Sequence, residues 1–129
     1  MRLLLDTHIF LWYTTGDSRI KPAVRRAIED SDSAYLSVVS LWEATTKYQL
    51  GKLPLPEPPH PWLTEQRESH GFDSLALDEA SVARLPTLPM HHRDPFDRML
   101  ICQALQHDLL VVTVDSVLEK YPAQLLLSP

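Results

Sequence analysis

The chain has 129 residues, of which 44% are hydrophobic and 22% are charged, and its formal net charge at pH 7 is −5. This length suits one compact domain that can fold without disulfides, and the single cysteine, Cys102, excludes a disulfide within the chain. The negative charge argues against a protein that coats nucleic acid, because such proteins carry a broad basic face. It does not exclude a nuclease, because acids gathered in one metal site would account for part of the charge.

The start of the chain and the length of its apolar runs indicate its cellular compartment. No run approaches the roughly 20 apolar residues that are needed to span a membrane. Asp6 interrupts the initial run Leu3-Leu4-Leu5 too early for a signal peptide, and no small-residue cleavage site follows. We therefore predict a cytoplasmic protein without a membrane partner.

Strand-like and helix-like segments alternate in the first half of the chain. Pro22 suits the first turn of a helix, and Gly51 is a natural position for a helix to end. Apolar residues at helical spacing follow Pro22. The predicted strands here are residues 2–5 and 34–37, and the predicted helices are residues 8–15, 22–29 and 40–50.

The second half begins with a stretch rich in proline, residues 53–62. Proline fits neither a helix interior nor a central strand, so we expect an extended surface loop. Asp78 is the expected N-cap of a short helix that ends at Leu85, and Pro86 and Pro89 bracket a loop. The other predicted elements are helices at 62–70, 95–107 and 116–121 and strands at 72–77, 110–114 and 125–127. This alternation predicts one α/β domain over residues 1–129, with a mainly parallel sheet and right-handed crossovers.

Four acidic residues lie close to points where a strand-like run gives way to a helix-like run: Asp6, Glu43, Asp97 and Asp115. The carboxyl ends of parallel strands line one crevice, where ligands bind. Ionised acids that meet there repel one another, and a hard divalent cation with oxygen ligands relieves that repulsion. The pattern therefore points to metal-assisted phosphoryl chemistry.

Each acid also has a structural explanation. Asp6 and Asp115 can each cap the helix that follows them. Glu43 completes a capping-box pattern with Ser40, and it can form an ion pair with Lys47 one helical turn later. These explanations leave the roles of the acids open when each residue is considered alone.

Asp97 is open to the same two interpretations. Asp94 is the expected N-cap and Pro95 the first helical residue, so Asp97 falls in the first turn, where the helix dipole favours a negative charge. Asp97 is then either a favourable first-turn acid or a metal ligand. Capping alone does not require an acid at all of these positions, because serine, threonine and asparagine also cap helices. The joint pattern therefore favours a metal site.

The chain contains the segments LLLDTHIFLW, SVVSLWEATTKYQLGKLPL, HHRDPFDRMLICQA and LLVVTVD. Together they resemble the signature segments of PIN-domain ribonucleases, and most closely those of the VapC-type toxins of bacterial toxin–antitoxin pairs. The resemblance extends over almost the whole chain, and HRDPFDRMLI combined with EATTKYQLGKL is its specific part. The chain departs from the family at Thr45-Thr46, where aliphatic residues are usual, and in the number of prolines in its loop. Neither departure touches the acids.

The resemblance implies a PIN-like three-layer sandwich, with a central, mainly parallel sheet flanked by helices. It also implies an endoribonuclease that depends on Mg²⁺, with Mn²⁺ as an alternative, and that hydrolyses RNA phosphodiester bonds. The family's catalytic and metal-binding acids correspond to Asp6, Glu43, Asp97 and, as a more variable fourth, Asp115. Asp6 and Asp97 are the expected direct ligands. Glu43 binds metal or positions the attacking water.

Several other residues are candidates for contact with the substrate. Thr7 and Thr113 lie beside strand-end acids and are expected to orient ligands or waters. The candidates for holding the RNA backbone are Lys47, Lys52, Arg93 and Arg98, although ordinary solvated charges or ion pairs explain each equally well. No histidine is needed as a general base. We expect His8 on the helix surface or at the edge of the core, in preference to a ligand. We expect His91 and His92 in an exposed loop, with a metal or catalytic role as the alternative.

The resemblance also implies partners: an RNA substrate, a cognate antitoxin, and a second copy of the chain in a homodimer, within a larger toxin–antitoxin assembly. An acidic pocket would attract an arginine or lysine of the antitoxin, which would compete with metal. Aromatic side chains that either meet such partners or belong to the core are Trp12, Trp42, Tyr48 and Trp62.

Other classes of protein fit the sequence less well. A receiver-like domain would place a lysine after a late strand, where this chain has Asp115. A phosphotransferase with Asp6 as nucleophile would have a second aspartate at position 8, which is His8 here. The main alternative is a non-catalytic PIN-like module that binds RNA or protein, and the intact set of acids argues against it.

Overall fold

A five-stranded sheet in the order β3-β2-β1-β4-β5 organises the computed structural model, which describes residues 1–127. All neighbouring strands are parallel. The strands are β1 (Arg2–Leu5), β2 (Ser33–Ser37), β3 (Asp73–Leu75), β4 (Leu110–Thr113) and β5 (Leu125–Leu127). The strand order reverses between β1 and β4, and ligands bind at such a reversal in open α/β sheets.

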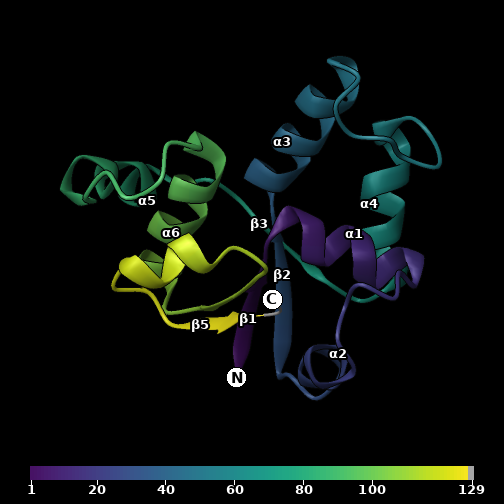
Figure 1. Ribbon diagram of the computed structural model, residues 1–129, viewed down its shortest axis with the longest axis horizontal. Helices are drawn as coiled ribbons and strands as arrows, with labels where there is room; N and C mark the ends of the chain where they lie inside the picture. Colours follow the sequence, from purple (N-terminus) through teal and green to yellow (C-terminus); the bar gives the residue numbers. More distant parts are fainter. Residues whose placement is uncertain (128–129) are drawn as a thin grey trace.

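Helices cover both faces of this sheet, with α1, α2 and α4 on one side and α5 and α6 on the other (Figure 1). The α-helices are α1 (Thr7–Thr15), α2 (Pro22–Glu29), α3 (Val38–Gln49), α4 (Pro59–Ser69), α5 (Glu79–Ala83) and α6 (Pro95–His107). Two short 3₁₀ helices are η1 (Leu85–Thr87) and η2 (Ser116–Lys120). Helices and sheet thus form the expected three-layer α/β sandwich. None of the helices within residues 1–127 has the length and apolar character of a segment that crosses a bilayer.

The central strand β1 is buried on both faces, as its continuous leucines require. Successive side chains of a strand point to opposite faces, so Leu3 and Leu5 join the core beneath α1, α2 and α4, while Leu4 joins the core beneath α6. All three leucines are fully buried. Burial on both faces is characteristic of parallel strands, and it places Asp6, the next residue, at the carboxyl edge of the sheet.

The start of α3 differs from the sequence prediction. The helix begins at Val38 rather than Ser40, and its N-cap is Ser37, whose Oγ accepts a hydrogen bond from the Val39 amide at 3.0 Å. The predicted capping box between Ser40 and Glu43 is therefore wrong. The structure instead places Glu43 in the second turn of α3, inside the layer of helices.

Ser37 also fixes the position of α3 relative to α6 through Gln103. The Ser37 hydroxyl donates to Gln103 Oε1 at 2.6 Å, and the side-chain amide of Gln103 donates through Nε2 to the Ala76 carbonyl at 3.2 Å. Both side chains are fully buried, where an unmade hydrogen bond is costly. This connection holds together the two helices that carry Glu43 and Asp97.

The remaining differences concern the proline-containing segments and β3. Helix α4 begins at Pro59, but His60 has non-helical torsions (φ −106°, ψ 128°), so regular helical backbone starts after it. Pro86 lies in η1 rather than in a loop. Strand β3 spans only Asp73–Leu75, shorter than predicted. Asp78 and Asp94 cap α5 and α6 as expected, each accepting hydrogen bonds from main-chain amides.

Candidate active site

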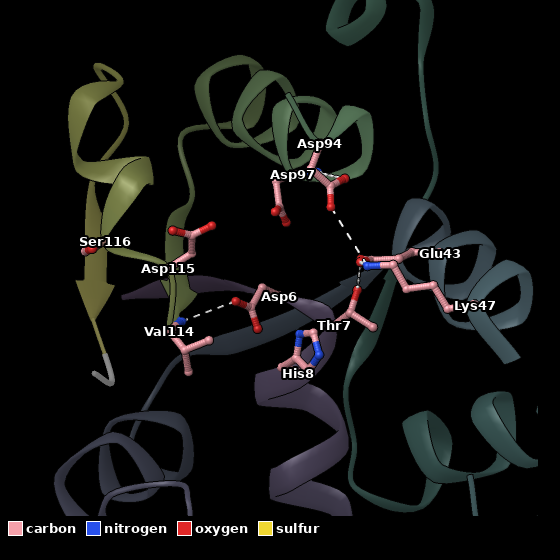
Figure 2. Close-up of a pocket in the computed structure, with 10 residues that line it drawn as sticks. All are labelled: Asp6, Thr7, His8, Glu43, Lys47, Asp94, Asp97, Val114, Asp115 and Ser116. Carbon is pink, nitrogen blue, oxygen red and sulfur yellow. Dashed lines mark hydrogen bonds and ion pairs between the residues drawn. The ribbon is translucent and has the colours of Figure 1, made fainter. Parts of the chain in front are cut away.

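A pocket of about 360 Å³ lies at the carboxyl edge of the sheet, and all four predicted acids line it (Figure 2). Asp6 follows β1, Glu43 projects from α3, Asp97 from the first turn of α6, and Asp115 follows β4. Asp94 lines the pocket as well. The predicted convergence of the acids from four separate segments is therefore confirmed.

Main-chain amides hold two of the four acids, Asp6 and Asp115. Asp6 caps α1 through Oδ1, which accepts from the Ile9 amide at 2.7 Å, and its Oδ2 accepts from the Val114 amide at 3.3 Å. Asp115 caps η2 through Oδ1, which accepts from the Val117 amide at 2.9 Å. Capping and a place in the pocket are thus compatible, because the caps fix the carboxylates where the strands end.

Glu43 is held by side chains instead. It is 3% exposed, and the Thr7 hydroxyl donates to its Oε1 at 2.6 Å. Its Oε2 forms an ion pair with Lys47, and the Lys47 ammonium also lies 3.8 Å from Asp94 Oδ2. Burial alone lowers the pKa of Lys47, but the hydrogen bond and charge of Glu43, with the charge of Asp94, raise the pKa overall. Lys47 is therefore a cation built into an acidic pocket.

Asp97 lies among the other carboxylates of the pocket, in the first turn of α6. Its burial, followed by the charges of Asp94, Glu43 and Asp6, raises its pKa to about 7. Like charges close together disfavour ionisation, so one carboxyl of such a group retains its proton at unusually high pH. Burial also raises the pKa of Asp6, opposed first by a hydrogen bond with Thr113 and then by the Ile9 amide.

The predicted substrate contacts differ in their positions relative to the pocket. Thr7 and Lys47 line the pocket, whereas Thr113 is buried beside it and its Oγ1 accepts from the Asp115 amide at 3.1 Å. Arg93 is exposed in the loop before α6. The expectation for Arg98 requires correction, because Arg98 is only 8% exposed.

The guanidinium of Arg98 is occupied inside the protein. It donates to the Pro89 carbonyl at 2.9 Å and to the Tyr121 hydroxyl at 3.4 Å. Buried polar groups are normally satisfied in this way. Arg98 therefore anchors the loop before α6, and we remove it from the residues expected to hold RNA.

His92 is the site residue that the sequence prediction missed. The sequence predicts an exposed loop residue, but its side chain is 19% exposed, with Nε2 at 2.7 Å from Asp115 Oδ2 and 3.3 Å from Asp97 Oδ2. One ligand atom from each of these three residues lies within 4.8 Å of the others. The sequence signals for His92 were its place two residues before the Asp94 cap and within the segment HHRDPFDRMLICQA. His8 does line the pocket, from an exposed position on α1 as expected.

The donor chemistry of the pocket fits a hard divalent cation. Carboxylate oxygens are the ligands that Mg²⁺ and similar ions prefer, and Asp6, Glu43, Asp97 and Asp115 supply them from four directions (Figure 2). Five carboxylates and one lysine line the pocket, and burial together with the neighbouring negative charges raises the pKa of Asp97. A cation would relieve this repulsion.

Asp97 should make the metal-free protein less stable as the pH rises. Its folded pKa of about 7 lies above the ordinary 3.8, so its stabilising contribution is complete below about pH 4 and is lost as the pH rises through 7. Because a tenfold change in proton affinity corresponds to about 1.4 kcal/mol, the loss is at most a few kcal/mol. We expect Asp97→Asn to flatten the fall in melting temperature between pH 5 and 8, measured in EDTA. An identical slope in wild type, Asp97→Asn and the exposed control Asp30→Asn would contradict this.

Comparisons with known proteins agree with the fold. A family model described as the PIN domain matches residues 3–124. Ribonuclease VapC22 of Mycobacterium tuberculosis is 26% identical over 120 residues, which are 92% of this chain and 91% of that protein.

Solved structures are similar at lower identity. The structure of VapBC2 from Rickettsia felis bound to a DNA fragment from its promoter has a TM-score of 0.73 and 14% identity, over 98% of each chain. A toxin–antitoxin complex from Klebsiella pneumoniae has a TM-score of 0.66 and 14% identity, again over 98% of each chain. At this identity the likeness concerns the fold alone.

Proposed function

Because the chain belongs to the PIN-domain family, we propose that it is a metal-dependent endoribonuclease, the toxin of a toxin–antitoxin pair. The observation that carries the proposal is the meeting of Asp6, Glu43, Asp97 and Asp115 in one pocket at the reversal of the strand order. The similarity to a ribonuclease over 92% of the chain supports RNA as the substrate. The reaction is hydrolysis of a phosphodiester bond, in the cytoplasm.

The proposed cofactor is Mg²⁺, with Mn²⁺ as an alternative, held by Asp6 and Asp97 with support from Asp115 and Glu43. When bound, a divalent cation would polarise the scissile phosphate and increase the acidity of a water molecule. The protein's own contribution is to fix the carboxylates before substrate arrives. Amides of Ile9 and Val114 do this for Asp6.

Glu43 is the proposed residue that orients the attacking water. Its carboxylate faces the pocket between Thr7 and Lys47 (Figure 2), and the donated hydrogen bond from Thr7 restricts its rotation. The ion pair with Lys47 holds the other carboxylate oxygen of Glu43. The Lys47 side chain is 30% exposed, so its ammonium is available to an RNA phosphate, and exposed Arg93 is the second proposed phosphate contact.

Cleavage of a mixed pool of cellular RNA by the purified chain, freed of any partner, tests this proposal. We expect cutting with Mg²⁺ or Mn²⁺, none with EDTA, and a loss of at least 10²-fold in Asp97→Asn, because removal of one electrostatic catalytic group typically costs about 10²–10³-fold. Asp30→Asn removes the same charge from an exposed position outside the pocket and should cut like wild type.

Two results would contradict the nuclease proposal. Cutting that persists equally in EDTA or in Asp97→Asn would show that the pocket is not responsible. No cutting with either metal would instead favour the non-catalytic binding module.

We further propose an antitoxin partner that places an arginine or lysine in the pocket, and a homodimer of the chain. The pocket supports the first proposal because five carboxylates and one lysine line it. An exposed apolar surface supports the homodimer. Trp42 on α3 is 61% exposed, and its ring packs edge-on against the ring of Phe96, with the ring centroids 4.9 Å apart. Trp62, in contrast, is buried in the core.

The antitoxin proposal predicts that the complex binds Mn²⁺ more weakly than the free chain and cuts RNA more slowly. Both effects arise because a basic side chain in the pocket competes with the cation for the same carboxylates. Titration calorimetry and the RNA assay on the free chain and the complex measure them. A complex with full metal affinity and full activity would refute the mechanism.

A further inference from the structure

His92 is fixed at three points beside the pocket. Its main-chain amide donates to the Tyr121 hydroxyl at 2.9 Å, and the two ring nitrogens contact different groups. Nδ1 lies 3.0 Å from the main-chain nitrogen of Asp94, and Nε2 lies 2.7 Å from Asp115 Oδ2. Tyr121 is itself buried, so the ring is held in place from both its loop and the core.

These contacts assign the tautomer of the imidazole. The Asp94 main-chain N–H can only donate, so Nδ1 of His92 must accept and carries no hydrogen. The hydrogen of the neutral ring is therefore on Nε2, where it points to Asp115 and, at 3.3 Å, toward Asp97. A metal ligand would need a lone pair on Nε2 and a hydrogen on Nδ1. That hydrogen would point at the Asp94 main-chain N–H, and two donors cannot form a hydrogen bond with each other.

We propose that His92 is a positioning residue of the proposed nuclease, which holds the carboxylate of Asp115 beside Asp97 through its Nε2–H and does not ligate the metal. The inference rests on the proposed function. The cap from Val117 holds only Oδ1 of Asp115, and His92 holds Oδ2 of this side chain, which is 33% exposed and lies among like charges.

Asp94 helps to position these side chains through both its carboxylate and its main-chain N–H. Its side chain caps α6 by accepting from the Phe96 amide at 2.9 Å, which places the first turn of α6 and thus Asp97. Its main-chain N–H fixes the tautomer of His92. One residue therefore positions two of the proposed ligands, and groups of this kind around a metal site typically change metal affinity by roughly 10–100-fold.

Nitrogen-15 NMR of the imidazole, in EDTA and again with Mg²⁺, reads the tautomer directly. The proposal predicts a protonated Nε2 and an unprotonated Nδ1 for His92 in both conditions. A hydrogen on Nδ1, or loss of the Nε2 hydrogen when Mg²⁺ is added, would overturn it in favour of a metal-ligating histidine.

Two variants test the roles of the two ring nitrogens separately. His92→Gln places an amide donor near the position of Nε2, whereas the shorter His92→Asn can accept from the Asp94 amide but does not reach Asp115. We expect Mn²⁺ affinity, measured by calorimetry, to fall roughly 10–100-fold in His92→Asn and to be largely restored in His92→Gln. Circular dichroism and melting temperature verify that both are folded.

The outcomes distinguish this inference from the nuclease proposal, because neither readout uses RNA. Equal Mn²⁺ affinity in His92→Asn and wild type, or equal loss in both folded variants, would overturn the positioning role alone. The predicted variant effects in a protein that cuts no RNA would contradict the nuclease proposal alone. A wild type that binds no Mn²⁺ would overturn both.

Discussion

Mutual repulsion of carboxylates at the carboxyl edge of β1 and β4 is the constraint on which the site depends. The fold places five carboxylates in one pocket and offsets them with Lys47, with main-chain amides and with a proton on Asp97, whose pKa is raised to about 7. These compensations are incomplete, since burial and like charges still disfavour ionisation. A divalent cation would supply the remaining positive charge. The repulsion that destabilises the metal-free protein would therefore favour metal binding.

The groups that hold this charge in place are also the groups that start the helices. Asp6, Asp94 and Asp115 each accept a main-chain hydrogen bond as an N-cap, at α1, α6 and η2. An N-cap is typically worth about 1 kcal/mol, and the helix dipole favours a negative charge there. Local folding signals and site chemistry therefore reside in the same residues. For this reason, capping and metal ligation are both reasonable interpretations of each acid when the sequence is considered alone.

The sequence was sufficient for features that depend on local pattern and on sheet topology. Buried leucines predicted β1, Asp94-Pro95 predicted the start of α6, and the alternation of elements predicted that the acids would meet. What it could not supply depends on tertiary packing. Ser37 and Ser40 are both good N-caps, and the buried contact of Ser37 with Gln103 favours the first. His92 approaches Asp115 because Tyr121 and Arg98 fix the path of the loop before α6, and no periodicity encodes that path.

The number of protons released when Mn²⁺ binds, from calorimetry at pH 7 in two buffers with different heats of ionisation, tests whether the crowded carboxylates form the metal site. Asp97, with a pKa of about 7, is half protonated at that pH, and a metal ligand must be deprotonated. We predict release of about half a proton or more for each cation bound, because the pKa of Asp6 is raised as well, and a smaller release in Asp97→Asn. Binding without proton release in the wild type, or the same release in both proteins, would contradict a metal site built from these carboxylates.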